Sequence, residues 1–355
     1  MHERLLASLE SVADVRLVAA LRHERLGFPN GKDLRVFTGD VHLISEKRLI
    51  EGEFTYATNH PKLLTSVVAA LAELRSQAAQ DETVEVYQLG DFLDLWREAP
   101  RPDQQPDVPA RIKDDHEDLI TAFLDRRLGL HFLLGNHDLD LCRWPDYAGW
   151  ERRYYLPDAA PGVVVLHGDY FDWVERLPAS IQEIFVYLFA AGVAPNDYVL
   201  GRMRALSLES HAGRDYRRQI QLAQAAPIGP LRPPRADGIP PEWNVQREGV
   251  ADIANLRFLD SAYRECLKAN REFGLNLKVA VIGHTHHARI AVREAGDGGL
   301  FTLIDCGAWI ENCRAQDGAG SSPNAQIAAL SAGEARIYQL APKPITPPVG
   351  VPGAA

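Results

Sequence analysis

Five short stretches of the sequence place aspartate, histidine or asparagine directly after an apolar run. They are Asp40-Val41-His42, Gly90-Asp91-Phe92-Leu93-Asp94, Gly135-Asn136-His137-Asp138, His167-Gly168-Asp169 and Gly283-His284-Thr285-His286. An apolar run that stops at such residues is typical of a buried strand whose last side chains leave the core. Because ligands gather outside the carboxyl ends of strands in open α/β sheets, we expect the five strand ends to form one site.

Seven of these side chains offer a carboxylate oxygen, an amide oxygen or an imidazole nitrogen to a metal ion. They are Asp40, His42, Asp91, Asn136, His167, His284 and His286. On residue type alone, a single histidine after a strand is more often a core or surface residue than a ligand. Seven such residues together favour a metal site. The set is too large for one tetrahedral zinc and suits two divalent ions that share a carboxylate. Two such ions can hold a phosphoryl group and activate a water.

The motifs D-x-H, G-D-x-x-D, G-N-H-D, H-G-D and G-H-x-H occur in this order, and the sequence thereby resembles the calcineurin-like metallophosphoesterases. The resemblance covers roughly residues 33–175 and 277–313. It implies two metal ions, for which Mn²⁺ or Fe²⁺ is expected and Zn²⁺ also fits. The ligands that it implies for one ion are Asp40, His42, Asp91 and His286. Those for the other are Asn136, His167, His284 and Asp91, which bridges the two.

The same resemblance implies the catalytic residues. His137 would contact the phosphate and donate a proton to the leaving oxygen, and Asp138 would orient its imidazole. Asp94 and Asp169 would support the ligands without binding metal themselves.

The stretches around the last two motifs and at 307–313 resemble the bacterial branch related to UDP-2,3-diacylglucosamine diphosphatase. That branch cleaves a pyrophosphate bond in a lipid precursor. We therefore expect an enzyme that hydrolyses a phosphodiester or pyrophosphate bond of a phosphorylated small molecule or an amphiphile. A serine/threonine protein phosphatase or phosphomonoesterase on the same fold remains the alternative. A binding scaffold without catalysis would be expected to lack some ligands, and a nuclease would be expected to be less acidic.

The runs before the five motifs predict the core strands of an α/β fold. Helices are predicted at 61–74 and 112–127, so the first three strands form parallel crossovers. We expect an amphipathic helix at 1–27, a loop at 43–58, and further strands at 288–294, 300–305 and 335–340. The resemblance implies a four-layer α/β/β/α sandwich, with the crossovers in one sheet and the later strands mostly in the other.

The sequence predicts a single domain over residues 1–342, followed by a flexible tail at 343–355 that is rich in Pro, Gly and Ala. The long interval between the last two motifs predicts a mostly helical insertion at 175–276, with helices at 180–192 and 250–273. The sequence leaves open whether this insertion is a lid, a substrate-gripping cap or scaffolding.

The composition of the chain limits the binding partners and the cellular compartment that we expect for the protein. The net charge of −10 argues against nucleic-acid binding. The four cysteines form no CxxC pair, which favours reduced thiols in the cytoplasm. The N-terminus lacks the apolar core of a signal peptide. The longest apolar stretch, 184–193, is too short for a transmembrane helix, although peripheral membrane contact stays open.

Overall fold

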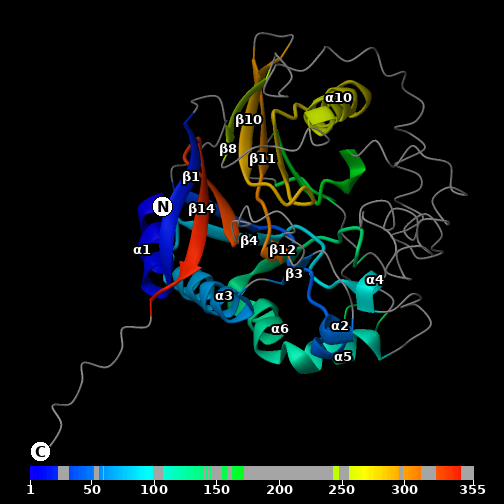
Figure 1. Cartoon of the computed structure of the whole chain (residues 1–355). Helices are drawn as coiled ribbons and strands as arrows, with labels where there is room; N and C mark the ends of the chain where they lie inside the picture. The colour runs from blue at the N-terminus through cyan, green and yellow to red at the C-terminus, as the bar shows by residue number, and fades with distance from the viewer. Residues whose placement is uncertain are drawn as a thin grey trace, which may run out of the picture.

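The structure of the chain is a computed structural model. It describes residues 1–22, 32–51, 56–58, 60–98, 107–138, 141, 144, 147, 154–157, 162–171, 243–247, 256–295, 299–312 and 325–344. These residues form a mixed α/β structure in which helices cover two mixed sheets (Figure 1). The predicted α/β class is confirmed.

The first sheet contains three parallel strands that supply motif residues. In spatial order its strands are β1 (Ala13–Arg22), β14 (Glu334–Pro342), β13 (Gln326–Ser331), β2 (Asp33–Thr38), β4 (Thr83–Gln88) and β5 (Leu130–Phe132). β2, β4 and β5 are parallel, with Val36 opposite Val86 and Val86 opposite Leu130. Their carboxyl ends therefore lie along one edge of the sheet.

The second sheet contributes the remaining two motif strands. Its spatial order is β6 (Tyr154–Tyr155), β7 (Val163–Leu166), β9 (Val279–Ile282), β11 (Leu300–Asp305), β10 (Arg289–Glu294) and β8 (Trp243–Arg247). β7, β9 and β11 run parallel, and both β7 and β9 are fully buried apolar runs. A short antiparallel pair joins β3 (Tyr56–Thr58) to β12 (Ile310–Asn312).

The described helices mostly bury apolar residues against these sheets. They are α1 (His2–Val12), α2 (Glu46–Glu51), α3 (Pro61–Ser76), α4 (Leu95–Glu98), α5 (Val108–Asp115), α6 (Glu117–Leu124) and α10 (Leu256–Phe273), with 3₁₀ turns η3 (Arg126–Leu128) and η6 (Asp169–Phe171). In α3, Pro61 occupies the first turn, where a missing N–H costs nothing. Leu64, Val67 and Leu71 follow at helical spacing and are buried.

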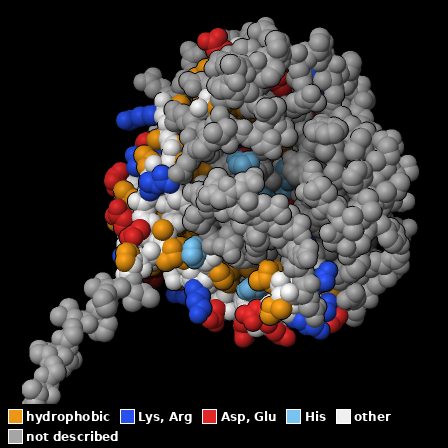
Figure 2. Space-filling model, in the orientation of Figure 1, with side chains coloured by type: hydrophobic (Ala, Val, Ile, Leu, Met, Phe, Trp, Pro, Cys, Tyr) orange, Lys and Arg blue, Asp and Glu red, His pale blue; other side chains and the backbone are white. Residues whose placement is uncertain are grey.

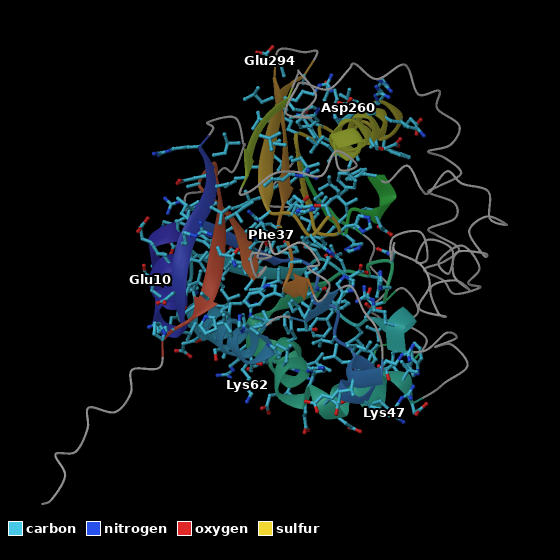
Figure 3. The ribbon with its side chains drawn as sticks, in the orientation of Figure 1. Glu10, Phe37, Lys47, Lys62, Asp260 and Glu294 are labelled. Atoms are coloured by element: carbon cyan, nitrogen blue, oxygen red, sulfur yellow. The ribbon has the colours of Figure 1, made fainter. Side chains whose placement is uncertain are left out.

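Three hydrophobic clusters hold the elements together. One joins α1, α3, α5 and α6 to the first sheet, for example through Leu64 and Val86. The next contains Phe37 of β2 and Val281 of β9, so the two sheets pack face to face. The third joins the second sheet to α10 through Ala280 and Leu259. Figure 3 accordingly shows Phe37 near the centre of the molecule, with Asp260 of α10 and Lys62 of α3 on opposite sides of it.

The N-terminal prediction is wrong in its second half. The helix α1 ends at Val12, and residues 13–22 form the strand β1 instead of continuing the helix expected to 27. β1 pairs antiparallel with β14 from Ala13 opposite Pro342 to Arg22 opposite Glu334. Without β1, one edge of β14 would have unpaired backbone groups. The local sequence of residues 13–22 does not show that this edge needs a partner strand.

Other boundaries also differ from prediction. The expected loop at 43–58 contains α2 and β3, and the helix expected at 112–127 is divided between α5 and α6 at His116. β13 and β14 join the first sheet, so the strands after His286 are shared between both sheets.

Part of the predicted insertion is also described. The helix expected at 250–273 is α10, while β8 adds a strand to the second sheet. Residues 172–242 and 248–255 lie outside the described residues, as does the tail beyond 344. They include the helix expected at 180–192 and the start of the one expected at 250–273.

Candidate metal centre

All seven predicted ligands meet at the carboxyl ends of the motif strands. Asp40 and His42 follow β2, Asp91 follows β4, Asn136 follows β5, His167 follows β7, and His284 and His286 follow β9. Two backbone contacts draw the two sheets together here: the N–H of His284 donates to Asp40 Oδ1 at 2.9 Å, and that of Trp309 to Asp40 O at 2.7 Å. Figure 2 shows histidine side chains near the middle of one face of the molecule.

The local backbone is bent in an unusual way to bring the side chains together. His42, Asp91, His284 and His286 all have positive φ, between 52° and 69°. Such conformations are costly for non-glycine residues and persist where the surroundings impose them, which is common at functional sites. A Cβ atom at Gly135 would lie 2.1 Å from Asp91 Oδ1, so only glycine allows this approach of the two loops.

The first ligand group surrounds the Nε2 atom of His167. The Nδ1 of this ring donates to the carbonyl oxygen of Leu89 at 2.9 Å, which leaves a lone pair on Nε2 of the neutral ring. Asn136 Oδ1 lies 2.9 Å from this Nε2, His284 Nδ1 lies 3.1 Å away, and Asp91 Oδ2 lies 3.2 Å away. Three further atoms that can donate electron pairs thus lie within 3.2 Å of His167 Nε2.

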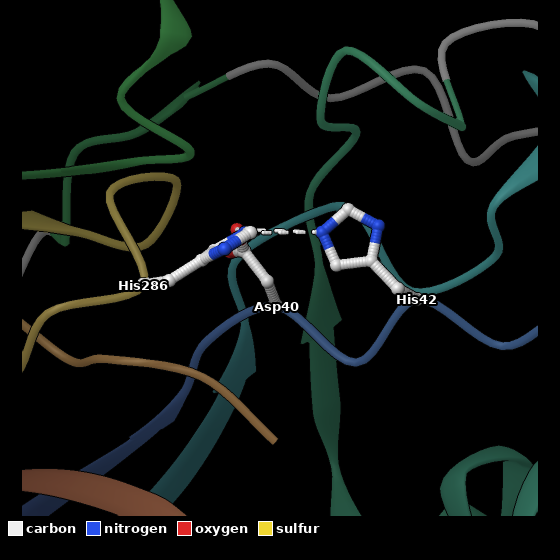
Figure 4. A group of neighbouring side chains, drawn as sticks. All are labelled: Asp40, His42 and His286. Carbon is white, nitrogen blue, oxygen red and sulfur yellow. Dashed lines mark hydrogen bonds and ion pairs between the residues drawn. The ribbon is translucent and has the colours of Figure 1, made fainter. Parts of the chain in front are cut away.

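The second group consists of Asp40, His42 and His286 (Figure 4). His286 Nε2 lies 2.9 Å from Asp40 Oδ2 and 3.2 Å from His42 Nε2. The other ring nitrogen of His42 donates to Asp94 Oδ2 at 3.1 Å, so the Nε2 of the neutral ring has its lone pair directed into the group. Carboxylate–histidine pairs of this kind fix the ring orientation of metal ligands.

Asp91 lies between the two groups. Its Oδ2 is 3.2 Å from His167 Nε2 in the first and 3.7 Å from His42 Nε2 in the second. Its Oδ1 accepts a hydrogen bond of 2.7 Å from the backbone N–H of His137. The side chain is only 2% exposed. Asp91 therefore has the position that a carboxylate shared by two ions would need.

These distances fit a bound cation. Metal–ligand bonds of about 2.0–2.2 Å place neighbouring ligand atoms about 3 Å apart. Within the described residues, the histidine and aspartate groups within metal-binding reach are Asp40–His42–His286, Asp91–His167–His284 and, less expected, His42–Asp91–His137. The buried groups could therefore hold a metal ion.

The electrostatics of the cluster also favour positive charge. Burial would raise the pKa of Asp91, but the neighbouring charges of His167 and His137 lower it to about 2. Burial would lower the pKa of His167, but the charges of Asp91 and Asp40 raise it to about 9. The buried carboxylates thus stabilise a proton on His167, and a cation would supply the same charge, whereas burial lowers the pKa of His286 to about 4.

The predicted catalytic pair is only partly as expected. The imidazole Nδ1 of His137 donates to Asp94 Oδ1 at 2.8 Å. Asp138 instead accepts hydrogen bonds from the backbone N–H groups of Phe92 at 2.8 Å and Gly135 at 2.7 Å. The partner of the His137 ring is therefore Asp94 rather than Asp138, whose carboxylate ties together the two loops that follow β4 and β5.

An apolar groove of about 440 Å³ lies beside this centre, between α10 and the strands β6 and β7. Phe171 in its wall packs 5.8 Å from the ring of Phe258, which in turn lies 6.3 Å from the ring of His284. Tyr154 and Phe273 also line the groove and are 49% and 66% exposed. The groove thus exposes apolar surface to solvent, and the buried ring of Phe258 lies between its wall residue Phe171 and His284.

Sequence reasoning did not select Asp305, a buried residue at the end of β11 that contacts the motif residue Thr285. The same signal that identified the motifs was present, because Asp305 also follows an apolar run at a strand end.

Comparison with protein-family models and with curated protein sequences gives no match to this chain. In the part of the chain that the structure describes, no helix has the length and apolar character needed to cross a membrane.

Proposed function

We propose that the chain is a calcineurin-like metallophosphoesterase that hydrolyses a phosphodiester or pyrophosphate bond with a metal-activated water. The observation that carries the proposal is the position of Asp91 Oδ2, 3.2 Å from His167 Nε2 and 3.7 Å from His42 Nε2, between two groups of convergent ligand atoms. The proposal includes the α/β/β/α order of layers, which the three hydrophobic clusters support.

Asp40, His42, Asp91 and His286 would hold one divalent ion, and Asp91, Asn136, His167 and His284 the other. Mn²⁺ and Fe²⁺ suit this mixed oxygen and nitrogen set, and Zn²⁺ also fits. Two such ions supply charge for the phosphoryl oxygens and lower the pKa of water.

His137 is suited to act on the leaving group. Asp94 accepts from its Nδ1, so the ring is fixed and its Nε2 is the atom left to hold a proton. Burial lowers the pKa of His137, and the charge of Asp94 opposes this shift by stabilising the imidazolium form, which can donate that proton to a departing oxygen. Burial would raise the pKa of Asp94, but the charges of His137 and of Arg97, which lies 3.1 Å away, hold it well below its ordinary value.

The groove supports an amphiphilic substrate. A substrate with its phosphoryl group at the metal centre could place an apolar part in the groove, because only the ring of Phe258 separates the wall residue Phe171 from His284. A lid or cap role for the segment 175–276 and a cytoplasmic location belong to the same proposal.

The test is a comparison of hydrolysis rates with Mn²⁺ on bis(p-nitrophenyl) phosphate, p-nitrophenyl phosphate and UDP-sugar pyrophosphates. We expect the diester or the pyrophosphate to be the better substrate, and activity to disappear with chelator. Faster hydrolysis of the monoester and of phosphoserine peptides would favour the protein phosphatase alternative. No activity on any of them with Mn²⁺, Fe²⁺ or Zn²⁺ would contradict the proposal.

A further inference from the structure

The loop Gly283–His286 carries two candidate ligands in a conformation that needs support. His284 and His286 have φ of 69° and 60°, a conformation that non-glycine residues keep only where their surroundings hold it. The two rings belong to different ligand groups, because His284 Nδ1 lies beside His167 and His286 Nε2 lies beside Asp40. A small rotation of this loop would therefore disturb both groups at once.

The residue between the two histidines ties the loop to a neighbouring strand. The hydroxyl of Thr285 donates to Asp305 Oδ2, and the backbone N–H of His287 donates to the same hydroxyl at 3.3 Å. Thr285 is 6% exposed and Asp305 is fully buried. One hydroxyl thus fixes the middle of the loop and the residue that follows it.

Asp305 is itself held from two further directions. Arg289, its cross-strand partner at the start of β10, places Nη2 3.3 Å from Asp305 Oδ2. The backbone N–H of Gly307 lies 3.5 Å from Oδ1. A buried carboxylate is stable only with such partners. Arg289 is 1% exposed and Asp305 is fully buried, so the pair is shielded from water.

We propose that Asp305, acting through the Thr285 hydroxyl, is a positioning residue that holds His284 and His286 in the geometry needed for metal binding. The inference rests on the metal binding proposed above. Neither Thr285 nor Asp305 is needed as a ligand, and neither would contact substrate. Their role is to fix the loop backbone before the ions bind, so that binding does not have to order it.

The test uses Thr285→Val, which removes the hydroxyl and keeps the shape, Thr285→Ser, which keeps the hydroxyl, and Thr302→Val as the control. Thr302 is buried on the same strand as Asp305, three residues before it. Affinity of the metal-free proteins for Mn²⁺ is measured by calorimetric titration, and the unfolding temperature is measured with and without Mn²⁺. Loss of an outer partner of a metal site typically weakens binding about 10- to 100-fold.

We expect that loss for Thr285→Val, recovery for Thr285→Ser, and wild-type affinity for Thr302→Val. If Thr285→Val does not fold, Thr285→Ala removes the hydroxyl without adding a buried methyl group and should give the same loss. A purely structural role would lower the unfolding temperature of the metal-free variant and leave its Mn²⁺ affinity unchanged, which would overturn the inference. Absence of Mn²⁺ binding in the wild-type protein would instead overturn the proposed metal centre together with it.

Discussion

The carboxylate of Asp94 accepts a hydrogen bond from the His137 ring, with 2.8 Å between Oδ1 and Nδ1. Its other oxygen accepts from His42 Nδ1 at 3.1 Å. A single buried side chain therefore orients both a candidate metal ligand and the candidate proton donor. Metal binding and proton donation thus both depend on Asp94.

Replacement of Asp94 should impair both functions. In Asp94→Asn the charge that stabilises the His137 imidazolium is lost and the His42 ring is less well fixed, so we expect turnover and Mn²⁺ affinity each to fall about 10- to 100-fold. Steady-state kinetics and metal titration measure the two effects. Asp118→Asn, an exposed position on α6, is the control. A fall in turnover with no change in affinity would show that Asp94 serves His137 alone.

His137 should affect turnover rather than metal content. In His137→Gln we expect the bound metal to be retained and turnover to fall about 10²- to 10⁴-fold, the usual contribution of a general acid. The loss should shrink for p-nitrophenolate esters, whose leaving group needs no proton. Because His137 also lies within metal-binding reach of His42 and Asp91, metal analysis decides between the two roles: loss of an ion in this variant would make His137 a ligand.

Asp91 should affect both ions. We expect Asp91→Ala to abolish binding of two Mn²⁺ per chain, because its Oδ2 contacts ligand atoms of both groups. Elemental analysis of the purified variant measures this, with Asp118→Asn as the matched acidic control. Retention of one tightly bound ion in Asp91→Ala, or only one in the wild-type protein, would contradict a shared carboxylate.

Gly135 should be intolerant of a side chain. A Cβ there would meet Asp91 Oδ1 at 2.1 Å, so we expect Gly135→Ala to destabilise the fold by about 1–3 kcal/mol and to lose metal affinity. At Gly274, with φ of +65°, a Cβ would have no atom within 4 Å. Gly274→Ala should therefore cost only the backbone strain, about 1–2 kcal/mol, and keep its affinity. Equal Mn²⁺ affinity in both variants would exclude the close approach as a functional requirement.

The groove should contribute to recognition of amphiphilic substrates only. Ala269 of α10 lines it, and Ala269→Phe fills part of its volume. We expect a higher KM for a substrate with an acyl chain and nearly unchanged kinetics for bis(p-nitrophenyl) phosphate. Arg271→Phe adds the same ring at an exposed position of α10 and is the control. If Ala269→Phe leaves the KM of the acylated substrate unchanged, the groove plays no part in binding that substrate.

The sequence by itself determined the residue types at the strand ends and the α/β class. Local sequence encodes both features. An apolar run such as 163–166 is typical of a buried strand, and the polar residues that follow it leave the core where the strand ends. Carboxylate, amide and imidazole groups at five such ends then limit the chemistry to a few possibilities.

Only the tertiary structure decided which distant groups meet. Residues 13–22 are extended because β14, more than 300 residues later, needs a neighbour, and this pairing overrides their local helical pattern. Asp94 rather than Asp138 contacts the His137 ring because the loop after β4 lies against the loop after β5. Asp305 reaches Thr285 only because β11 pairs with β9. These contacts join residues far apart in the chain, and hydrogen bonding and packing in the folded state, not local sequence, select them.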